Sequence, residues 1–332
     1  MARTISIFNN KGGVGKTTYM FHVAHLLAST SLTVLMVDCD GQANLTAHTL
    51  RNAAIRKSWS PDGNSIWKNI EQVAKGVGDV GQRSPIQFNP RYPTLYIVPG
   101  DLRLTDFEDR LGDTWSAAKG GSEAAVRVQS AIHRYIKWAA NKIKADVVLV
   151  DLGPSLGAIN RAVLASSDYF IIPMAPDLFS IEGTRNLGEK LVLWHREWAQ
   201  CHQAWNGNDV ELPDGTPKFL GYVIQSHNIR NNSEKMTRGW NMFGRIIEQN
   251  VQSNIVDKLT TIDQVVDWAD GSYNLGMIPN LHSLIPYSQA ARKPVFDCSY
   301  GDGLQGAHVT RAAESRDHFS GIVDIIRQTL VW

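Results

Sequence analysis

Short, uninterrupted apolar runs recur along the chain, and longer stretches of mixed polarity separate them. Runs of this length are typical of strands that are buried on both faces, as in a parallel sheet covered by helices. The pattern predicts strands at residues 4–8, 34–37, 95–98, 147–150, 169–172, 219–224 and 275–278.

The segments between these runs show the spacing of α-helices. One face of a predicted helix at 16–28 carries Met20, Val23, Ala24 and Leu27. Another helix is predicted at 123–143, just before the strand that starts at residue 147. Strands that alternate with helices predict the α/β class, here a doubly wound, mostly parallel sheet with helices on both faces.

The chain shows no internal repeat and no long linker, so we expect one domain over residues 1–332. Two segments, near 51–93 and 200–218, are rich in the turn-forming residues Asn, Gly, Pro and Asp. We expect both to be surface insertions in the loops of this domain.

Charge and cysteine content exclude several classes of protein. Lys and Arg number 33 and Asp and Glu 32, so any contact with nucleic acid must come from a local patch. The three cysteines, Cys39, Cys201 and Cys298, include no CxxC pair, which favours the reducing cytoplasm and argues against a cysteine metal site. We also expect no signal peptide and no membrane-spanning helix.

The most informative motif is NNKGGVGKTT at residues 9–18, between a predicted strand and a predicted helix. This is the setting of a phosphate-binding loop, in which glycines let backbone N–H groups approach phosphate oxygens. Lys16 is expected to reach the β- and γ-phosphates, and the Thr17 hydroxyl to ligate Mg²⁺. The strict motif is not met, because Asn10 stands where its first glycine would be. The alternative is a glycine-rich turn without a ligand.

The string KGGVGKTT resembles the deviant Walker A motif of the ParA/MinD family of ATPases, and the resemblance extends along most of the chain. It implies that ATP and Mg²⁺ are the cofactors and that ATP binding produces a homodimer. It also implies a role for Lys11, which would cross to the partner's phosphates and act like an arginine finger. The nucleotide-binding set is then Lys11, Gly12, Gly13, Val14, Gly15, Lys16, Thr17 and Thr18. The alternative for Lys11 is an exposed lysine at the start of a loop.

Two carboxylates follow the second predicted strand, in the segment VLMVDCDGQAN. Asp38 and Asp40 lie at the carboxyl end of this strand, where open α/β sheets bind their ligands. The segment resembles the family stretch DxDPQxN, with Gly41 in place of proline. The resemblance implies that Asp40 positions the attacking water and that Asp38 supports the Mg²⁺ shell. Otherwise both residues would only cap a turn.

A third carboxylate, Asp151, ends the apolar strand in ADVVLVDLGPSLG. This is the Walker B arrangement, with a carboxylate at a strand tip that faces the metal. The family pattern is DxPP, and Gly153 replaces its first proline. A structural N-terminal cap is the alternative role. The following segment, 159–187, also resembles the family, in which it forms part of the dimer face and the switch region.

Near the end of the chain, LGMIPN resembles the family segment that holds the adenine base. Pro279 and Asn280 are therefore our candidates for the base pocket. A regulatory, ligand-contacting helix would follow this segment.

The family uses its ATP cycle on several surfaces, and non-specific DNA is the first candidate here. A helix predicted from Ser233 has an apolar stripe, formed by Met236, Trp240, Phe243 and Ile247. Phosphate contacts without sequence readout are expected from the basic residues Arg238, Arg245, Arg292 and Lys293. An ordinary solvated helix face explains the same pattern.

A membrane surface is the second candidate, because MinD-type proteins end in a short amphipathic helix. The last predicted helix has an apolar stripe, formed by Phe319, Ile322, Val323, Ile326 and Leu330. Its polar face carries Asp317 and Asp324, whereas membrane-seeking helices prefer Lys and Arg there. We therefore expect this stripe to pack in the core, although Val331 and Trp332 look exposed.

Other roles known in the superfamily fit less well. Metallocluster ATPases use paired cysteines, and none lies between Cys39 and Cys201. A kinase or ligase role, or recruitment to a defence or signalling module, stays open. The sequence predicts an ATPase switch for plasmid or chromosome partition, or for cargo positioning on nucleoid DNA. A ParB-like or adaptor protein would stimulate its hydrolysis.

Overall fold

An eight-stranded sheet forms the centre of the fold, in the order β3-β4-β2-β5-β1-β6-β7-β8. The computed structural model describes residues 2–207, 209–227, 244–269, 271–281 and 283–330. All neighbouring strands are parallel except β3 and β4. The strands are β1 (Arg3–Ile7), β2 (Val34–Cys39), β3 (Ile86–Gln87), β4 (Leu95–Val98), β5 (Val147–Leu152), β6 (Tyr169–Met174), β7 (Lys218–His227) and β8 (Asn274–Pro279).

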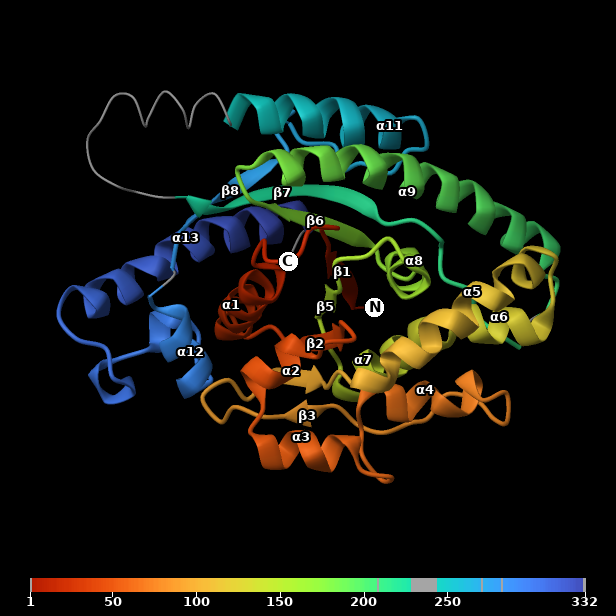
Figure 1. The fold of residues 1–332 in the computed structure, drawn as a ribbon, viewed down its shortest axis with the longest axis horizontal. Coiled ribbons are helices and arrows are strands. Elements are labelled where there is room, and N and C mark those ends of the chain that lie inside the picture. Colours follow the sequence, from red (N-terminus) through yellow and green to blue (C-terminus); the bar gives the residue numbers. More distant parts are fainter. Residues whose placement is uncertain (1, 208, 228–243, 270, 282, 331–332) are drawn as a thin grey trace.

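Helices cover both faces of this sheet, as the alternation along the sequence predicted (Figure 1). They are α1 (Lys16–Ser29), α2 (Asn44–Thr49), α3 (Asn52–Trp59), α4 (Ile66–Ala74), α5 (Thr105–Lys119), α6 (Glu123–Gln129), α7 (Ala131–Ile143), α8 (Ala158–Ala165), α9 (Leu178–Ala204), α11 (Asp257–Thr260), α12 (Ile285–Ala291) and α13 (Ala307–Leu330). Short 3₁₀ turns lie at Leu102–Leu104, Val295–Asp297 and Tyr300–Asp302, and a π-helical turn at Gln252–Val256.

Alternate residues of each strand enter two separate cores. In β1, for example, Ile5 and Ile7 pack with α1 and α13, while in β5 Val148 and Val150 pack with helices of the opposite face. Strands with apolar residues on both faces are what a sheet covered on both sides requires. The predicted α/β class and doubly wound sheet are therefore confirmed.

The predicted strands are all present, and most extend one or two residues beyond the apolar run. One helix differs from its prediction: the segment 123–143 forms two helices, α6 and α7, which meet at Ser130. The Ser130 hydroxyl donates to the Val126 carbonyl oxygen at 2.8 Å. A serine that bonds to the backbone four residues earlier favours such a break.

The two expected insertions contain more ordered structure than their turn-rich composition suggested. Segment 51–93 holds α3, α4 and β3, and α4 buries Ile66, Trp67 and Ile70 in the main core. The capping serine of α4, Ser65, accepts a hydrogen bond from the backbone N–H of Lys68. In segment 200–218, α9 continues to Ala204 before the chain returns to β7.

The apolar stripe of the last helix, α13, packs in the core. In α13 the side chains of Phe319, Ile322, Val323 and Ile326 are buried in the core shared with α1. The predicted core packing of this stripe is confirmed for these residues; the side chain of Leu330, and Val331 and Trp332, lie outside the described part of the chain. None of the described helices is long and apolar enough to cross a membrane.

Candidate functional site: a phosphate loop with three carboxylates

The loop between β1 and α1 has the geometry that a phosphate-binding loop needs. Gly13 and Gly15 have φ angles of 74° and 83°, in the left-handed region that favours glycine. Gly15 also has a close neighbour, because a Cβ atom there would lie 2.1 Å from Oε1 of Gln225. Gly15 is the N-cap of α1, so the positive end of this helix opens directly into the loop.

Lys16 folds back over this loop. Its Nζ donates to the carbonyl oxygens of Asn9 at 3.0 Å and Lys11 at 3.1 Å. Burial lowers the pKa of Lys16, and the nearby Asp151 and Asp40 oppose that effect. A buried cation bonded only to carbonyl oxygens is placed to exchange them for phosphate oxygens.

Thr17 and Asp151 form the second part of the site. The Thr17 hydroxyl donates to Oδ2 of Asp151 at 2.7 Å. The other oxygen, Oδ1 of Asp151, is buried and has no hydrogen-bond partner. Burial, followed by the charge of Asp38, raises the pKa of Asp151 to about 8. An orphaned carboxylate oxygen beside a hydroxyl fits the oxygen ligands that Mg²⁺ prefers.

Asp38 is turned towards its own loop. Its Oδ2 accepts the backbone N–H of Thr46 at 2.8 Å and the Thr46 hydroxyl at 2.6 Å, and its Oδ1 accepts the N–H of Asp40 at 3.2 Å. Burial raises the pKa of Asp38 to about 7. These contacts fix the loop that carries Asp40, so they support a positioning role for Asp38. Its predicted place in the Mg²⁺ shell stays a prediction.

Asp40 borders the main cavity. Its Oδ1 accepts the N–H of Gln42 at 3.0 Å, and its Oδ2 lies 3.5 Å from the Asn44 amide nitrogen. The unusual Gly153 has a role here, because a Cβ atom on it would lie 3.1 Å from Oδ1 of Asp40. The glycine in place of the family proline therefore leaves room for this carboxylate.

Two cavities meet at the loop. One, of about 610 Å³, is lined by Gly12, Gly13, Gly15, Lys16, Thr17, Thr18, Asp40, Gln42, Asn44, Ala47, His48, Pro154 and Gln289. The other, of about 120 Å³, is lined by Gly13, Gly15, Thr18, Gln225, Ile278, Pro279, Asn280, Leu281, Ile285 and Phe319. Pro279 and Asn280 thus lie beside the phosphate loop, where the base pocket was predicted. Val14 is buried and lines neither cavity.

Lys11 does not line either cavity. Its Nζ forms an ion pair with Asp177, the N-cap residue of α9, and lies 5.8 Å from the centre of the Phe179 ring. The two apolar residues next to Asp177 are strongly exposed, Leu178 at 63% and Phe179 at 75%. Lys11 therefore lies at an apolar surface patch beside the loop.

The predicted DNA contacts fall into three groups. Arg238 lies outside the described residues, while Arg245 is exposed on a helical segment. Nε of Arg292 donates to the Leu50 carbonyl oxygen at 3.0 Å, and Lys293 pairs with Asp302 at 2.6 Å. These last two side chains are thus already bound within the chain. Contact with DNA through any of the four stays a prediction.

Several residues of the site were missed by the sequence reasoning. Glu108 of α5 accepts the backbone N–H groups of Ala158 and Ile159, at the start of α8. Asn160 donates to the carbonyl oxygens of Gly153 at 2.8 Å and Ser155 at 2.6 Å. Both hold the loop after Asp151. The position of Gln225 at the carboxyl end of a predicted strand could have indicated its place.

Fold and loop together define a P-loop nucleotide-binding protein. A family model described as "AAA domain" matches residues 2–200. The chain belongs to this family and is a P-loop ATPase of the ParA/MinD type, as the deviant Walker A motif indicated.

Known relatives match a little over half of the chain. An uncharacterized protein of Methanocaldococcus jannaschii is 31% identical over 183 residues, 54% of this chain and 62% of that protein. The sporulation initiation inhibitor protein Soj of Bacillus subtilis is 29% identical over 187 residues, 56% of this chain and 64% of Soj. The virulence plasmid ParA family protein pGP5-D of Chlamydia psittaci is 27% identical over 188 residues, 56% and 62% of the two chains. The match thus spans less than two thirds of each relative.

Solved structures resemble the whole fold. A Corynebacterium diphtheriae protein has a TM-score of 0.70 at 23% identity, covering 99% of this chain and 98% of that one. A putative plasmid partition protein of Borrelia burgdorferi, bound to AMPPNP, has a TM-score of 0.55 at 18% identity, covering 98% of both chains. At these identities the likeness concerns the fold.

Proposed function

We propose that this chain is an ATP-dependent dimerisation switch that hydrolyses ATP to position a plasmid, a chromosome or another cargo on non-specific DNA in the cytoplasm. The observation that carries the proposal is the separation of the two lysines. Lys16 lies in the phosphate cavity, whereas Lys11 lies outside it, next to the exposed Leu178 and Phe179. A second copy would cover this apolar patch and bring the partner's Lys11 to the γ-phosphate.

The residues of one subunit divide the chemistry between them. Lys16 and the loop N–H groups bind the β- and γ-phosphates, and Thr17 with Asp151 holds Mg²⁺. Bound Mg²⁺ supplies positive charge that neutralises the phosphate oxygens. Asp40 accepts a hydrogen bond from the attacking water and orients it in line with the γ-phosphorus. The new P–O bond forms as the bond to ADP breaks, and Lys11 from the other subunit stabilises the charge on the transferring group.

The relatives favour partition over the alternatives. Soj and pGP5-D, by their names, are a sporulation regulator and a ParA family protein of a virulence plasmid, and one structural neighbour is a putative plasmid partition protein. The buried stripe of α13 argues against a MinD-like lipid contact, because its apolar side chains already pack in the core. Arg245 is exposed on the surface for which DNA contact is proposed.

Sedimentation velocity tests the switch. With Mg²⁺ and a non-hydrolysable ATP analogue the protein should dimerise, and with Mg²⁺–ADP it should be monomeric. Lys11→Ala should keep its nucleotide affinity and lose the dimer, while Lys57→Ala, a change at an exposed lysine of α3, should behave like the wild type. A Lys11→Ala protein that still dimerises on ATP and hydrolyses it at the normal rate contradicts the proposed trans role.

Co-sedimentation with plasmid DNA and with anionic liposomes tests the surface. Retention by DNA only in the ATP state supports partition or positioning, and it should weaken in Arg245→Ala. Binding to liposomes instead would favour the MinD-like alternative. Binding to neither surface would favour recruitment of the ATPase to a defence or signalling module.

A further inference from the structure

The first turn of α5 lies between the two loops that carry the carboxylates of the site. On one side it contacts the loop of Asp40, since a Cβ atom on Gly41 would lie 2.9 Å from Cγ2 of Thr105. On the other side Glu108 bonds to the first residues of α8, just after the loop that follows Asp151. One turn of a single helix therefore connects the loop after β2 with the loop after β5.

Glu108 caps α8 from outside that helix. The N-cap residue of α8 is Gly157, which has no side chain to accept a hydrogen bond. Instead, Oε1 of Glu108 accepts the backbone N–H of Ala158, and its Oε2 accepts that of Ile159 at 3.0 Å. A glycine is needed at this position, because a Cβ atom on Gly157 would collide with Oε1 of Glu108. The carboxylate is well placed, since the unpaired N–H groups and the dipole at a helix start favour negative charge.

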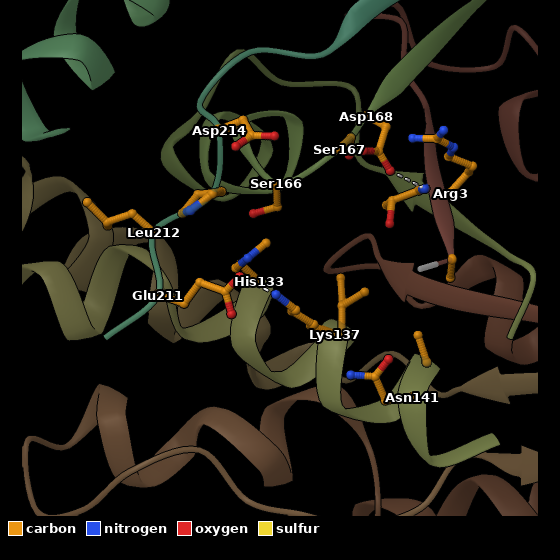
Figure 2. Close-up of a pocket in the computed structure, with 16 residues that line it drawn as sticks. Arg3, His133, Lys137, Asn141, Ser166, Ser167, Asp168, Glu211, Leu212 and Asp214 are labelled. Carbon is orange, nitrogen blue, oxygen red and sulfur yellow. Dashed lines mark hydrogen bonds and ion pairs between the residues drawn. The ribbon is translucent and has the colours of Figure 1, made fainter. Parts of the chain in front are cut away.

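The opposite end of α8 is bonded to the sheet. Just after the helix, the hydroxyl groups of Ser167 and Ser6 form a hydrogen bond at 2.6 Å. The next residue, Asp168, accepts the backbone N–H of Thr4 through Oδ2 at 2.7 Å. Figure 2 shows Ser167 and Asp168 beside Arg3, at the start of β1. The carboxyl end of α8 is thus held by β1, and its amino end by α5.

The start of α8 in turn holds the loop after β5. Asn160, in the first turn of the helix, is buried and donates to the carbonyl oxygens of Gly153 at 2.8 Å and Ser155 at 2.6 Å. Between these two residues, Pro154 lines the phosphate cavity. Gly153 itself lies against Asp40, where a Cβ atom on the glycine would be 3.1 Å from Oδ1 of the carboxylate. A shift of the helix start would therefore move the backbone that borders both the phosphate cavity and Asp40.

We propose that Glu108 is a positioning residue for ATP hydrolysis. By capping α8 from α5, it holds the loop after β5 against Asp40 and keeps this carboxylate aligned with the attacking water. Glu108 lines neither cavity at the phosphate loop, so it acts through α8 and not by contact with the nucleotide. A displacement of about 1 Å at a reacting group can slow a reaction about a hundredfold, so the contact affects hydrolysis more than binding. The inference rests on the proposed function, in which Asp40 orients the water.

Two substitutions separate the cap of α8 from its contact with α5. Glu108→Ala removes both. Adding Gly157→Ser returns a capping hydroxyl, because Gly157 has the extended backbone, with φ −85° and ψ −177°, that N-cap residues adopt. Without the Glu108 carboxylate there is room for the new Cβ, so the double variant regains the cap without the contact between the helices. Asp106→Ala is the matched control, since it removes a carboxylate of the same turn whose ion pair with Arg103 is exposed.

The hydrolysis rate, the nucleotide affinity and the stability are measured separately. Single-turnover hydrolysis gives the first, equilibrium binding of a fluorescent ATP analogue the second and urea unfolding the third. Glu108→Ala should hydrolyse ATP about tenfold more slowly at unchanged affinity, and it should unfold at a lower urea concentration. The double variant should regain the wild-type urea midpoint and stay slow. Asp106→Ala should match the wild type in all three measurements.

Hydrolysis at the wild-type rate in Glu108→Ala would overturn the inference. A double variant that regains both the rate and the urea midpoint would overturn it as well, because the cap alone would then suffice. If Glu108→Ala does not fold, the double variant still decides the question, since its α8 is capped.

Sedimentation velocity with Mg²⁺ and a non-hydrolysable ATP analogue separates this inference from the proposed function. The wild type and Glu108→Ala should both dimerise, because Lys11 is present in each. A wild type that neither dimerises nor hydrolyses ATP would overturn the proposed function, and the inference with it. Dimers in both proteins with equal hydrolysis rates would overturn the inference alone.

Discussion

Lys11 and Asp177 form an ion pair at the edge of the phosphate loop. Asp177 has a second role, because its Oδ1 accepts the backbone N–H of Ser180 at 3.0 Å and caps α9. The lysine that we expect to cross to a partner is therefore held by its own chain. Before it could cross, this ion pair would have to break, so the pair should oppose dimer formation.

Asp177→Asn tests this opposition. Asparagine is a good N-cap, so α9 should keep its start while the ion pair loses its charge. A partly exposed pair contributes about 0.5–1 kcal/mol and each of the two subunits breaks one, so the ATP-state dimer should become about five- to thirtyfold tighter. Sedimentation velocity over a range of protein concentrations measures this change.

Glu189→Gln provides the control for that variant. Glu189 lies on the same helix and pairs with Lys258 at 3.1 Å, away from the loop. Its replacement should leave dimerisation unchanged. A weaker dimer in Asp177→Asn would mean that Asp177 supports the dimer instead of opposing it.

Gly153→Ala is expected to slow ATP hydrolysis without weakening nucleotide binding. The new Cβ would lie 3.1 Å from Oδ1 of Asp40, so this carboxylate would have to move by a few tenths of an ångström. Small displacements of a group that positions the attacking water reduce the rate strongly, and we expect a decrease of about tenfold or more. Single-turnover hydrolysis and equilibrium binding of a fluorescent nucleotide separate the two effects.

Gly112→Ala is the matched control, because a Cβ there meets nothing within 4 Å. It should hydrolyse ATP at the wild-type rate. Normal turnover in Gly153→Ala would show that Asp40 does not need its present position.

Most of the fold could be predicted from local patterns in the sequence. The central strands are rich in apolar residues on both faces because helices cover the sheet on both sides, and the buried polar Ser6 of β1 is hydrogen-bonded to Ser167 at 2.6 Å. The break at Ser130 could not be predicted, because the apolar spacing continues from α6 into α7. The ordered structure around α4 depends on contacts of Trp67 with segments far away in the sequence. The turn-rich composition of this region gives no sign of these contacts.

The site was predictable only where one short segment contains the chemistry. Lys16, Thr17 and Asp151 were found because each belongs to a motif at a strand end. The ion pair of Lys11 with Asp177, and the contacts of Glu108 with α8, join residues about 50 to 170 positions apart. Such contacts are made by tertiary packing, so a single sequence without known relatives contains no local signal for them.

Three buried histidines should make the protein sensitive to acid. Burial lowers the pKa values of His22, His25 and His48 to about 3, 4 and 4, below their usual value of 6.5. The unfolded chain takes up protons near pH 6.5 and the folded chain does not, so these groups lower the free energy of unfolding as pH falls below 6.5.

His25→Leu isolates one of these groups. Nε2 of His25 is buried without a partner, and the substitution removes only the bond of Nδ1 to the Phe21 carbonyl oxygen at 2.7 Å, a loss that does not depend on pH. Between about pH 7 and 4.5 the wild type should lose about 2 kcal/mol more stability than the variant. Urea unfolding at a series of pH values measures the difference. Parallel curves for the two proteins would show that His25 is protonated in the folded state.

Removal of Mg²⁺ should reveal the opposite pH dependence at Asp151. Its pKa is raised to about 8, well above that of an unfolded aspartate, so the folded apo protein binds a proton that the unfolded chain has lost. In EDTA, the contribution of Asp151 to the free energy of unfolding should therefore fall as pH rises from about 4 to 8, and Asp151→Asn should be the more stable protein at pH 8. The asparagine can still accept a hydrogen bond from the Thr17 hydroxyl.

With Mg²⁺ and nucleotide the wild type should instead be more stable than Asp151→Asn, because only the wild type offers the metal a carboxylate. Thermal unfolding of both proteins at pH 6 and pH 8, with and without Mg²⁺–ADP, measures the four differences; equal stabilisation of the two proteins by Mg²⁺–ADP would exclude Asp151 as a metal ligand.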